Sequence, residues 1–349
     1  MNAELEVVAV GARIPLGYSA ESSAAAMRAG ISRYAEFPFI DARGEPVVVA
    51  SDGQLDPKLE GRDRLMPLLE SVLDEVEEKL GSAVLEGNRC RLLLSLPEVR
   101  PGFSDDDAAW LVSAMEARPR AKAARMRVEL AGRGHAGALR AVEQALRESS
   151  EGRESFFLVT GVDSYLHAET FLWLERDGRF AQPGIRGGFI PGEGAGCLAL
   201  MTAGLRRRLR LPRLEVVRGA RTAQERLLRG SDTGSFGVGM TQAVEGAVAG
   251  LDLSREKVDE LYADINGERY RSEEWGFVAL RTPSVWHSTA YRSLSDGWGD
   301  VGAAAGALGG VLAVRAFARG YARGPRVMVM AGSDGGLRGA MLLQDPRVS

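Results

Sequence analysis

Short apolar runs alternate along this chain with longer segments whose apolar residues recur at helical spacing. Each run has the length of a buried strand, and each longer segment has that of a helix. The strand-like runs cover residues 5–10, 91–96, 126–130, 156–161, 214–217, 260–265, 327–330 and 340–343. The helical segments cover residues 19–30, 59–80, 105–115, 138–149, 241–251 and 301–318. Strands that alternate with helices predict an α/β protein with buried, largely parallel sheets.

The alternation runs through the chain twice, which predicts two α/β halves, residues 1–209 and 210–349. A basic run at residues 206–210 lies where a helix of the first half is expected to end. Cations stabilise the C-terminus of a helix. No aromatic residue interrupts the run, so we interpret it as a solvated helix end rather than a nucleic-acid surface.

Composition adds several exclusions. The net charge of −3 gives no argument for binding to nucleic acid or to a membrane surface. No apolar run reaches the roughly 18 uncharged residues of a membrane span, and the acidic start lacks a signal-peptide pattern, so a cytoplasmic protein is expected. Two cysteines, Cys90 and Cys197, and three scattered histidines form no metal-ligand pattern. We therefore expect no disulfide, metal or cofactor, and we expect both cysteines to be inert core residues.

A glycine-rich turn around a single glutamate is the most distinctive motif. Residues 188–196 read G-F-I-P-G-E-G-A-G, and this stretch resembles the G-F-V-x-G-E-G-A-G segment of β-ketoacyl synthases. Further segments resemble motifs of the same family, in the family's order: residues 11–17, 62–64, 186–189, 262–267, 299–306 and 333–336. The resemblance covers roughly residues 5–343. It implies the thiolase fold, an αβαβα sandwich of five layers built from two halves related by a pseudo-twofold axis.

The family's reactive residues are replaced in this chain. Its nucleophilic cysteine stands at a strand-to-helix elbow, and the resemblance places His135 there. Asn266 and Asp300 take the places of the two catalytic histidines, and Ser295 takes that of a lysine, in a segment of unusual length. A histidine at a helix N-terminus is expected to stay neutral, because the helix dipole disfavours imidazolium.

These replacements leave two functional interpretations. The favoured one is a catalytically degenerate β-ketoacyl synthase homologue that acts as a structural, regulatory or acyl- or carrier-protein-binding partner. The alternative is an acyl-transfer, hydrolytic or decarboxylating enzyme that uses His135, Asn266 and Asp300. Condensing activity is expected to be absent under the first interpretation, because no nucleophile is present to hold an acyl group.

The resemblance also implies a partner. Dimers of this fold form where the strand that leads into the elbow pairs with its twin, and that strand is about residues 126–131. A homodimer is expected, with Arg127 and Glu129 in cross-strand ion pairs; a heterodimer with an active ketosynthase is the alternative. An acyl carrier protein is a further candidate partner. Trp275, Trp286 and Trp298 are expected to pack in the core rather than to line a pocket or interface.

Overall fold

Ten strands form one continuous, strongly twisted sheet in the computed structural model, which describes residues 4–119, 125–153, 155–182, 187–231 and 234–348. The first half of the sheet contains, in spatial order, β5 (Met126–Arg133), β4 (Cys90–Leu96), β6 (Phe156–Ser164), β7 (Glu193–Thr202) and β1 (Leu5–Arg13). The second half continues with β8 (Glu215–Gln224), β12 (Leu337–Gln344), β11 (Arg326–Gly332), β9 (Glu260–Ala263) and β10 (Tyr291–Ser293). The halves join through a short antiparallel contact between β1 and β8.

The two halves repeat one topology. We number the five sheet strands of each half from one to five in chain order. Outward from the joined strands β1 and β8, both halves then show the same spatial order, 1-5-4-2-3. Each half pairs its first two strand neighbours antiparallel and its outer two parallel. The predicted predominance of parallel pairing is therefore wrong for half of these contacts, because an apolar run carries no information about strand direction. The repeat is the expected pseudo-twofold relation.

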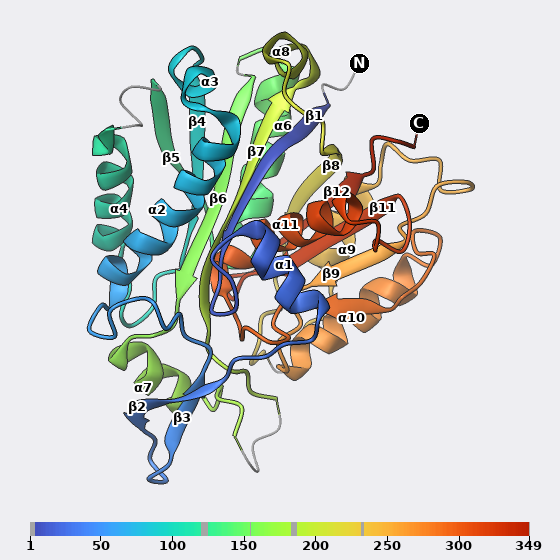
Figure 1. Cartoon of the computed structure of the whole chain (residues 1–349). Coiled ribbons are helices and arrows are strands. Elements are labelled where there is room, and N and C mark those ends of the chain that lie inside the picture. The colour runs from blue at the N-terminus through green and yellow to red at the C-terminus, as the bar shows by residue number, and fades with distance from the viewer. Residues whose placement is uncertain (1–3, 120–124, 154, 183–186, 232–233, 349) are drawn as a thin grey trace.

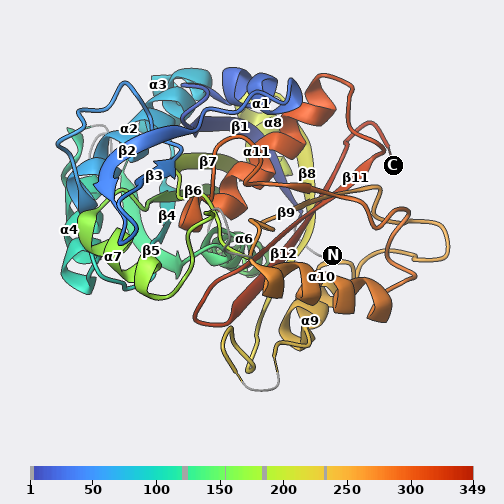
Figure 2. The same cartoon turned by 90° about the horizontal axis from the view of Figure 1, so that it is seen from below.

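Helices lie on both faces of each half and produce five layers (Figures 1 and 2). The outer face of the first half is covered by α2 (Gly61–Leu80) and α4 (Asp105–Ala117). The outer face of the second half is covered by α9 (Val238–Ala247) and α10 (Arg269–Arg281). Between the halves lie α6 (Gly137–Ser150) and α11 (Ala305–Ala318). The predicted αβαβα sandwich is confirmed.

Alternation along the strands explains the layering. On β11, Val327 and Val329 point into the central layer, whereas Met328 and Met330 point to the outer face of the second half. Successive side chains of a strand lie on opposite faces, so an uninterrupted apolar run indicates a strand covered on both sides. Such runs identified most of the central strands from the sequence.

The remaining elements are short. They are α1 (Ala20–Arg28), the hairpin strands β2 (Ala35–Ile40) and β3 (Pro46–Val49), α3 (Ser82–Glu86), α7 (Ala168–Arg176), α8 (Ala203–Leu209) and the 3-10 turn η1 (Gly302–Ala304). The sequence pattern identified α1 and α4, but it missed the hairpin, α7 and α10. The hairpin and α7 pack through a separate aromatic cluster around Phe171. No helix within the described ranges is long and apolar enough to cross a membrane.

The elbow between β5 and α6 is unusually tight. Gly134 has a φ of +66°, in the region that favours glycine, and the Gly137 N–H donates to the Gly134 carbonyl over 2.9 Å. A Cβ atom on Gly132 would lie 2.3 Å from the Gly137 carbonyl oxygen. The glycines therefore let the strand and helix backbones touch, and His135 lies at the top of this turn.

Candidate functional site

His135 lies in the elbow with 3% of its surface exposed. Its Nε2 atom is 2.8 Å from Asp300 Oδ1 and 3.1 Å from Asp300 Oδ2. Asp300 comes from the other half, directly before η1, where its Oδ1 also accepts the Gly302 N–H over 2.7 Å. Two of the candidate residues from the sequence thus form one buried acid–base pair at the contact between the halves.

Asn266 completes the set that the resemblance pointed to. It lies between β9 and α10, and its Nδ2 atom donates to Asp300 Oδ2 and, over 3.2 Å, to Glu268 Oε2. Along the chain, His135 lies 165 residues before Asp300, and Asn266 lies 34 residues before Asp300. The fold nevertheless brings these three residues into contact. Ser295 does not join them. Its contacts within the described part of the chain are backbone hydrogen bonds to Ser293, Tyr34 and Gly299.

Two buried arginines surround the pair. Arg271 donates to Asp264 over 2.6 Å and to the Gly332 carbonyl over 2.8 Å, and its Nη2 atom lies 3.4 Å from His135 Nε2. Arg179 forms two hydrogen bonds to Glu268, of 2.8 and 3.0 Å, and two to Asp334, of 2.6 and 3.2 Å.

The result is a closed network of three basic groups, His135, Arg179 and Arg271, and four carboxylates: Asp264, Glu268, Asp300 and Asp334. Sequence reasoning missed the arginines and three of these carboxylates. Glu268 and Arg271 follow Asn266 within five residues, and Asp334 lies in a turn that the motifs did identify. The clustering of these charged residues at or near the motifs is the sequence signal that could have indicated the network.

Electrostatics shift the pKa of both members of the pair. Burial by itself lowers the pKa of His135, but the neighbouring Asp300 carboxylate outweighs this and raises the pKa above its ordinary value. Burial raises the pKa of Asp300, and His135, Arg271 and the Gly302 N–H together hold that pKa well below its ordinary value. This direction is opposite to the one that the helix dipole by itself would give, because the Asp300 carboxylate outweighs the dipole. His135 Nδ1 has no hydrogen-bond partner among the described residues.

The backbone donors beside His135 are already occupied. The Ala136 N–H at the start of α6 donates to Ser333 Oγ over 3.1 Å, and Ser333 in turn donates to the Arg133 carbonyl. The Glu98 carboxylate accepts the N–H groups of Asp334 and Gly335 over 2.9 and 2.8 Å. Side chains of the protein thus take the positions in which a helix N-terminus and a turn would otherwise hold an anion.

The cysteines lie elsewhere. Cys90 and Cys197 are both buried, and Cys197 Sγ accepts a hydrogen bond from Thr160 Oγ1 over 3.1 Å. Burial raises the pKa of Cys197 to about 12, so its thiol stays protonated and unreactive at neutral pH. The predicted inert role of Cys197 is confirmed. No group of three potential metal ligands is found among the described residues.

The tryptophans are core residues, as predicted. Trp275 and Trp286 pack edge to face with their ring centroids 4.9 Å apart, and Trp298 is fully buried. A cavity of about 290 Å³ borders the network, and Arg179, Glu268 and Tyr270 line part of its wall. The walls of this cavity and of three others, of about 350, 380 and 540 Å³, do not include His135 or Asp300.

The five layers, the repeated strand order and the elbow define the thiolase fold in the form that ketosynthases have. No protein-family model matches the sequence, and no curated protein matches it. Solved ketosynthase structures do match its fold. A chain of the AntDE:AntF complex, a type II PKS acyl-carrier protein with its ketosynthase, superposes with a TM-score of 0.78 at 14% identity, covering 99% of this chain and all of that one.

Two further structures agree. The ketosynthase from module 6 of the bacillaene synthase of Bacillus subtilis 168 gives a TM-score of 0.78 at 15% identity and covers 98% of this chain and 72% of that one. The ishigamide ketosynthase/chain length factor gives 0.76 at 16% identity, covering 99% of this chain and 100% of that one. At such low identity these matches show a shared fold.

Proposed function

We propose that this chain is a non-condensing ketosynthase-fold protein that acts as a structural or regulatory partner and binds an acyl carrier protein or another ketosynthase-fold subunit. One observation carries the proposal. The elbow position holds an imidazole locked in an ion pair with Asp300, in place of a nucleophile. The similar structures include a complex with an acyl-carrier protein and a ketosynthase/chain length factor, which supports both kinds of partner.

The chemistry of the pair argues against condensation. A covalent acyl intermediate requires a nucleophile with a free electron pair. The Asp300 carboxylate favours the protonated form of His135, and neither ring nitrogen of that form has a free electron pair. The Asp300 carboxylate lies beside the elbow, where negative charge would develop on a thioester oxygen, and it would repel that charge. The arginines that could offset this repulsion are themselves bound to carboxylates.

The alternative enzyme has one observation in its favour. His135, Asn266 and Asp300 form a continuous hydrogen-bonded set, and a carboxylate that orients a histidine is a common arrangement in general acid–base catalysis. In that case His135 Nδ1 is the atom that would meet an acyl substrate, because Nε2 is held by Asp300. We rank this second, since the pair is buried.

The test separates the two functions. The purified protein is incubated with acyl- and malonyl-carrier protein, and products are followed by mass spectrometry. We expect no β-ketoacyl product from the wild type or from His135→Cys, since the new thiol would face the Asp300 carboxylate without a histidine. A β-ketoacyl product that depends on the wild-type protein would refute the proposal.

Hydrolysis of the acyl thioester is measured in the same samples. Release that is lost in Asp300→Asn and retained in His167→Gln, a control histidine outside the network, would establish the alternative enzyme. Binding of carrier protein without turnover, measured by copurification and native mass spectrometry, supports the partner role.

The proposal includes homodimerisation through β5, a division between halves near residues 209 and 210, and a cytoplasmic location.

A further inference from the structure

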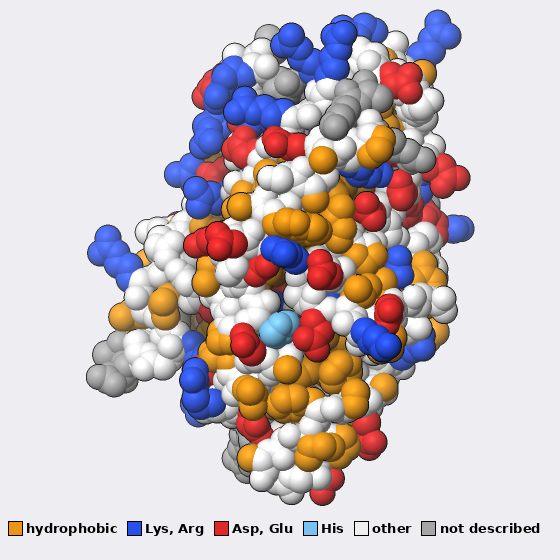
Figure 3. Space-filling model, turned by 90° about the vertical axis from the view of Figure 1, so that its left-hand side faces the viewer, with side chains coloured by type: hydrophobic (Ala, Val, Ile, Leu, Met, Phe, Trp, Pro, Cys, Tyr) orange, Lys and Arg blue, Asp and Glu red, His pale blue; other side chains and the backbone are white. Residues whose placement is uncertain are grey.

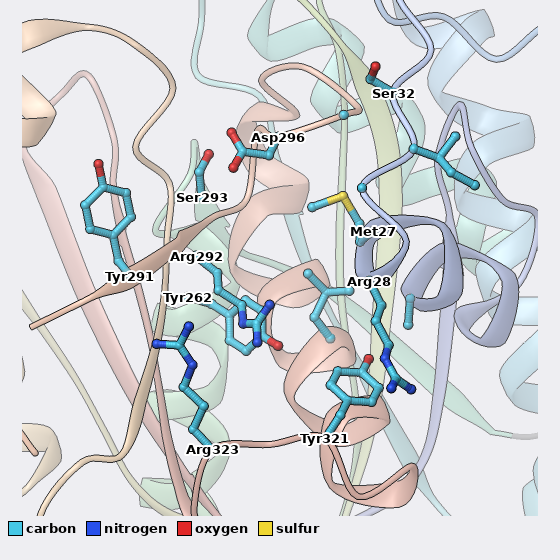
Figure 4. Close-up of a pocket in the computed structure, with 15 residues that line it drawn as sticks. Met27, Arg28, Ser32, Tyr262, Tyr291, Arg292, Ser293, Asp296, Tyr321 and Arg323 are labelled. Carbon is cyan, nitrogen blue, oxygen red and sulfur yellow. The ribbon is translucent and has the colours of Figure 1, made fainter. Parts of the chain in front are cut away.

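A second cavity lies away from the His135–Asp300 network, between α1 and the outer edge of the second half-sheet. Its volume is about 350 Å³, which is in the range of small-molecule sites. Figure 4 shows Arg28 and Tyr321 on one side and Arg323 on the other, with Arg292 and Tyr262 between them.

Two of its three arginines have no carboxylate partner among the described residues. Arg28 ends α1, and its guanidinium lies over the Tyr321 ring, 4.5 Å from the ring centroid. Arg323 donates its backbone N–H to Glu260 over 3.2 Å, but its side chain forms no ion pair within the described ranges. Most other arginines near this edge are paired, as Arg292 is with Glu260 and Arg315 is with Glu21.

The hydroxyl groups of buried Tyr262 and half-buried Tyr321 complete the cavity wall. Tyr262 is only 4% exposed, yet its hydroxyl has no hydrogen bond to any residue that the structure describes. Tyr262 lies beside Arg292 in the parallel pairing of β9 with β10, so the sheet itself fixes this tyrosine next to the arginines. Burial raises the pKa of Tyr262 and of Tyr321, and both phenols are therefore hydrogen-bond donors at neutral pH.

We propose that this cavity binds a small molecule that carries a phosphate group. Guanidinium groups match the geometry of phosphate oxygens and bind them through paired, charge-assisted hydrogen bonds. The two arginines without an ion pair and the free Tyr262 hydroxyl all line this one cavity, and all of them are hydrogen-bond donors. Asp296 and Ser293 lie at the opposite end of the cavity, where they would accept hydrogen bonds from the rest of the molecule (Figure 4).

The test is isothermal titration of the full chain with inorganic phosphate and with pyrophosphate. We expect binding to the wild type, and a loss of affinity of at least about tenfold in Arg28→Gln/Arg323→Gln. Neither arginine holds a carboxylate in place, so the double variant keeps its fold, which circular dichroism checks. Arg255→Gln serves as control for the loss of a positive charge, because Arg255 is an exposed residue that does not line the cavity.

Tyr262→Phe isolates the hydroxyl. This variant keeps the ring that fills the core and is expected to weaken phosphate binding several-fold with an unchanged melting temperature. Absence of binding to the wild type at millimolar phosphate and pyrophosphate would overturn the inference. Equal affinities in the wild type and the double arginine variant would also overturn it, as would an equal loss of affinity in Arg255→Gln.

Discussion

At the scale of single residues, the pair of His135 and Asp300 links stability to pH. The pKa of His135 is raised on folding, so its contribution is present below about pH 6.5 and is lost as the pH rises through the folded value. The pKa of Asp300 is lowered, so its contribution is present above about pH 4 and is lost only as the pH falls through the folded value. The stabilisation from this pair is therefore largest between about pH 4 and 6.5.

Asp300→Asn should cost about 3–5 kcal/mol of unfolding free energy in that window and less at alkaline pH.

Urea unfolding at several pH values measures this effect. Glu273→Gln is the matched control, because it breaks the ion pair of Glu273 with Arg269, whose side chains are 46% and 86% exposed. That change should cost less than about 1 kcal/mol, with little dependence on pH in this window. A destabilisation in Asp300→Asn that is the same at acidic and alkaline pH would contradict the assigned charge states.

At the scale of elements, the β5–α6 elbow depends on backbone contact. Gly132→Ala would place a Cβ atom 2.3 Å from the Gly137 carbonyl oxygen and 2.5 Å from Gly137 Cα, and neither atom can move without shifting α6. We expect a loss of at least about 3 kcal/mol, or failure to fold. Gly204→Ala in α8 is the control, since a Cβ there meets nothing within 4 Å. It should stabilise the protein by about 0.5–1 kcal/mol. Thermal unfolding measures the stability of both variants. A Gly132→Ala protein as stable as the wild type would refute this account of the elbow.

At the scale of the whole molecule, β5 is an edge strand whose one neighbour among the described strands is β4. Figure 3 looks onto the side where α4 and β5 lie, and hydrophobic patches there are interrupted by charged side chains. Antiparallel pairing centred on Val128 would bring Arg127 opposite Glu129 of the partner subunit, and Arg91 and Gln144 already hold this Glu129 carboxylate in place. In Arg127→Glu, two attractive contacts become repulsive, which should raise the dimer dissociation constant about tenfold.

Sedimentation equilibrium measures the dissociation constant, with Arg255→Glu as control for the same change of charge elsewhere. An unchanged constant in Arg127→Glu would place the interface away from β5, as would a wild type that stays monomeric at micromolar concentration without a copurifying homologue. A heterodimer would instead appear as a second ketosynthase-like subunit in native mass spectrometry.

Much of the fold could be predicted from local pattern, and the misses have physical causes. The strands buried on both sides, such as residues 156–161 in β6, read as continuous apolar runs. By contrast, α10 contains glycine, aromatic and many charged residues. Buried charges replace part of the usual apolar stripe: Arg271 belongs to the network, and Glu274 pairs with Arg338. The hairpin of β2 and β3 alternates weakly, since it packs through one small aromatic cluster.

The sequence by itself determined the alternation of strands and helices in two halves and the glycine-rich elbow at His135, because periodicity, glycine positions and residue type are local properties. The five-layered sandwich followed from the resemblance of its motifs to those of β-ketoacyl synthases. The tertiary structure alone decided that His135 is paired with Asp300, that Arg179 and Arg271 close the network, and that Ser295 lies outside it. The physical reason is that a pKa depends on distances between charges, and these distances are set by segments that are remote in the chain and meet only when the halves pack together.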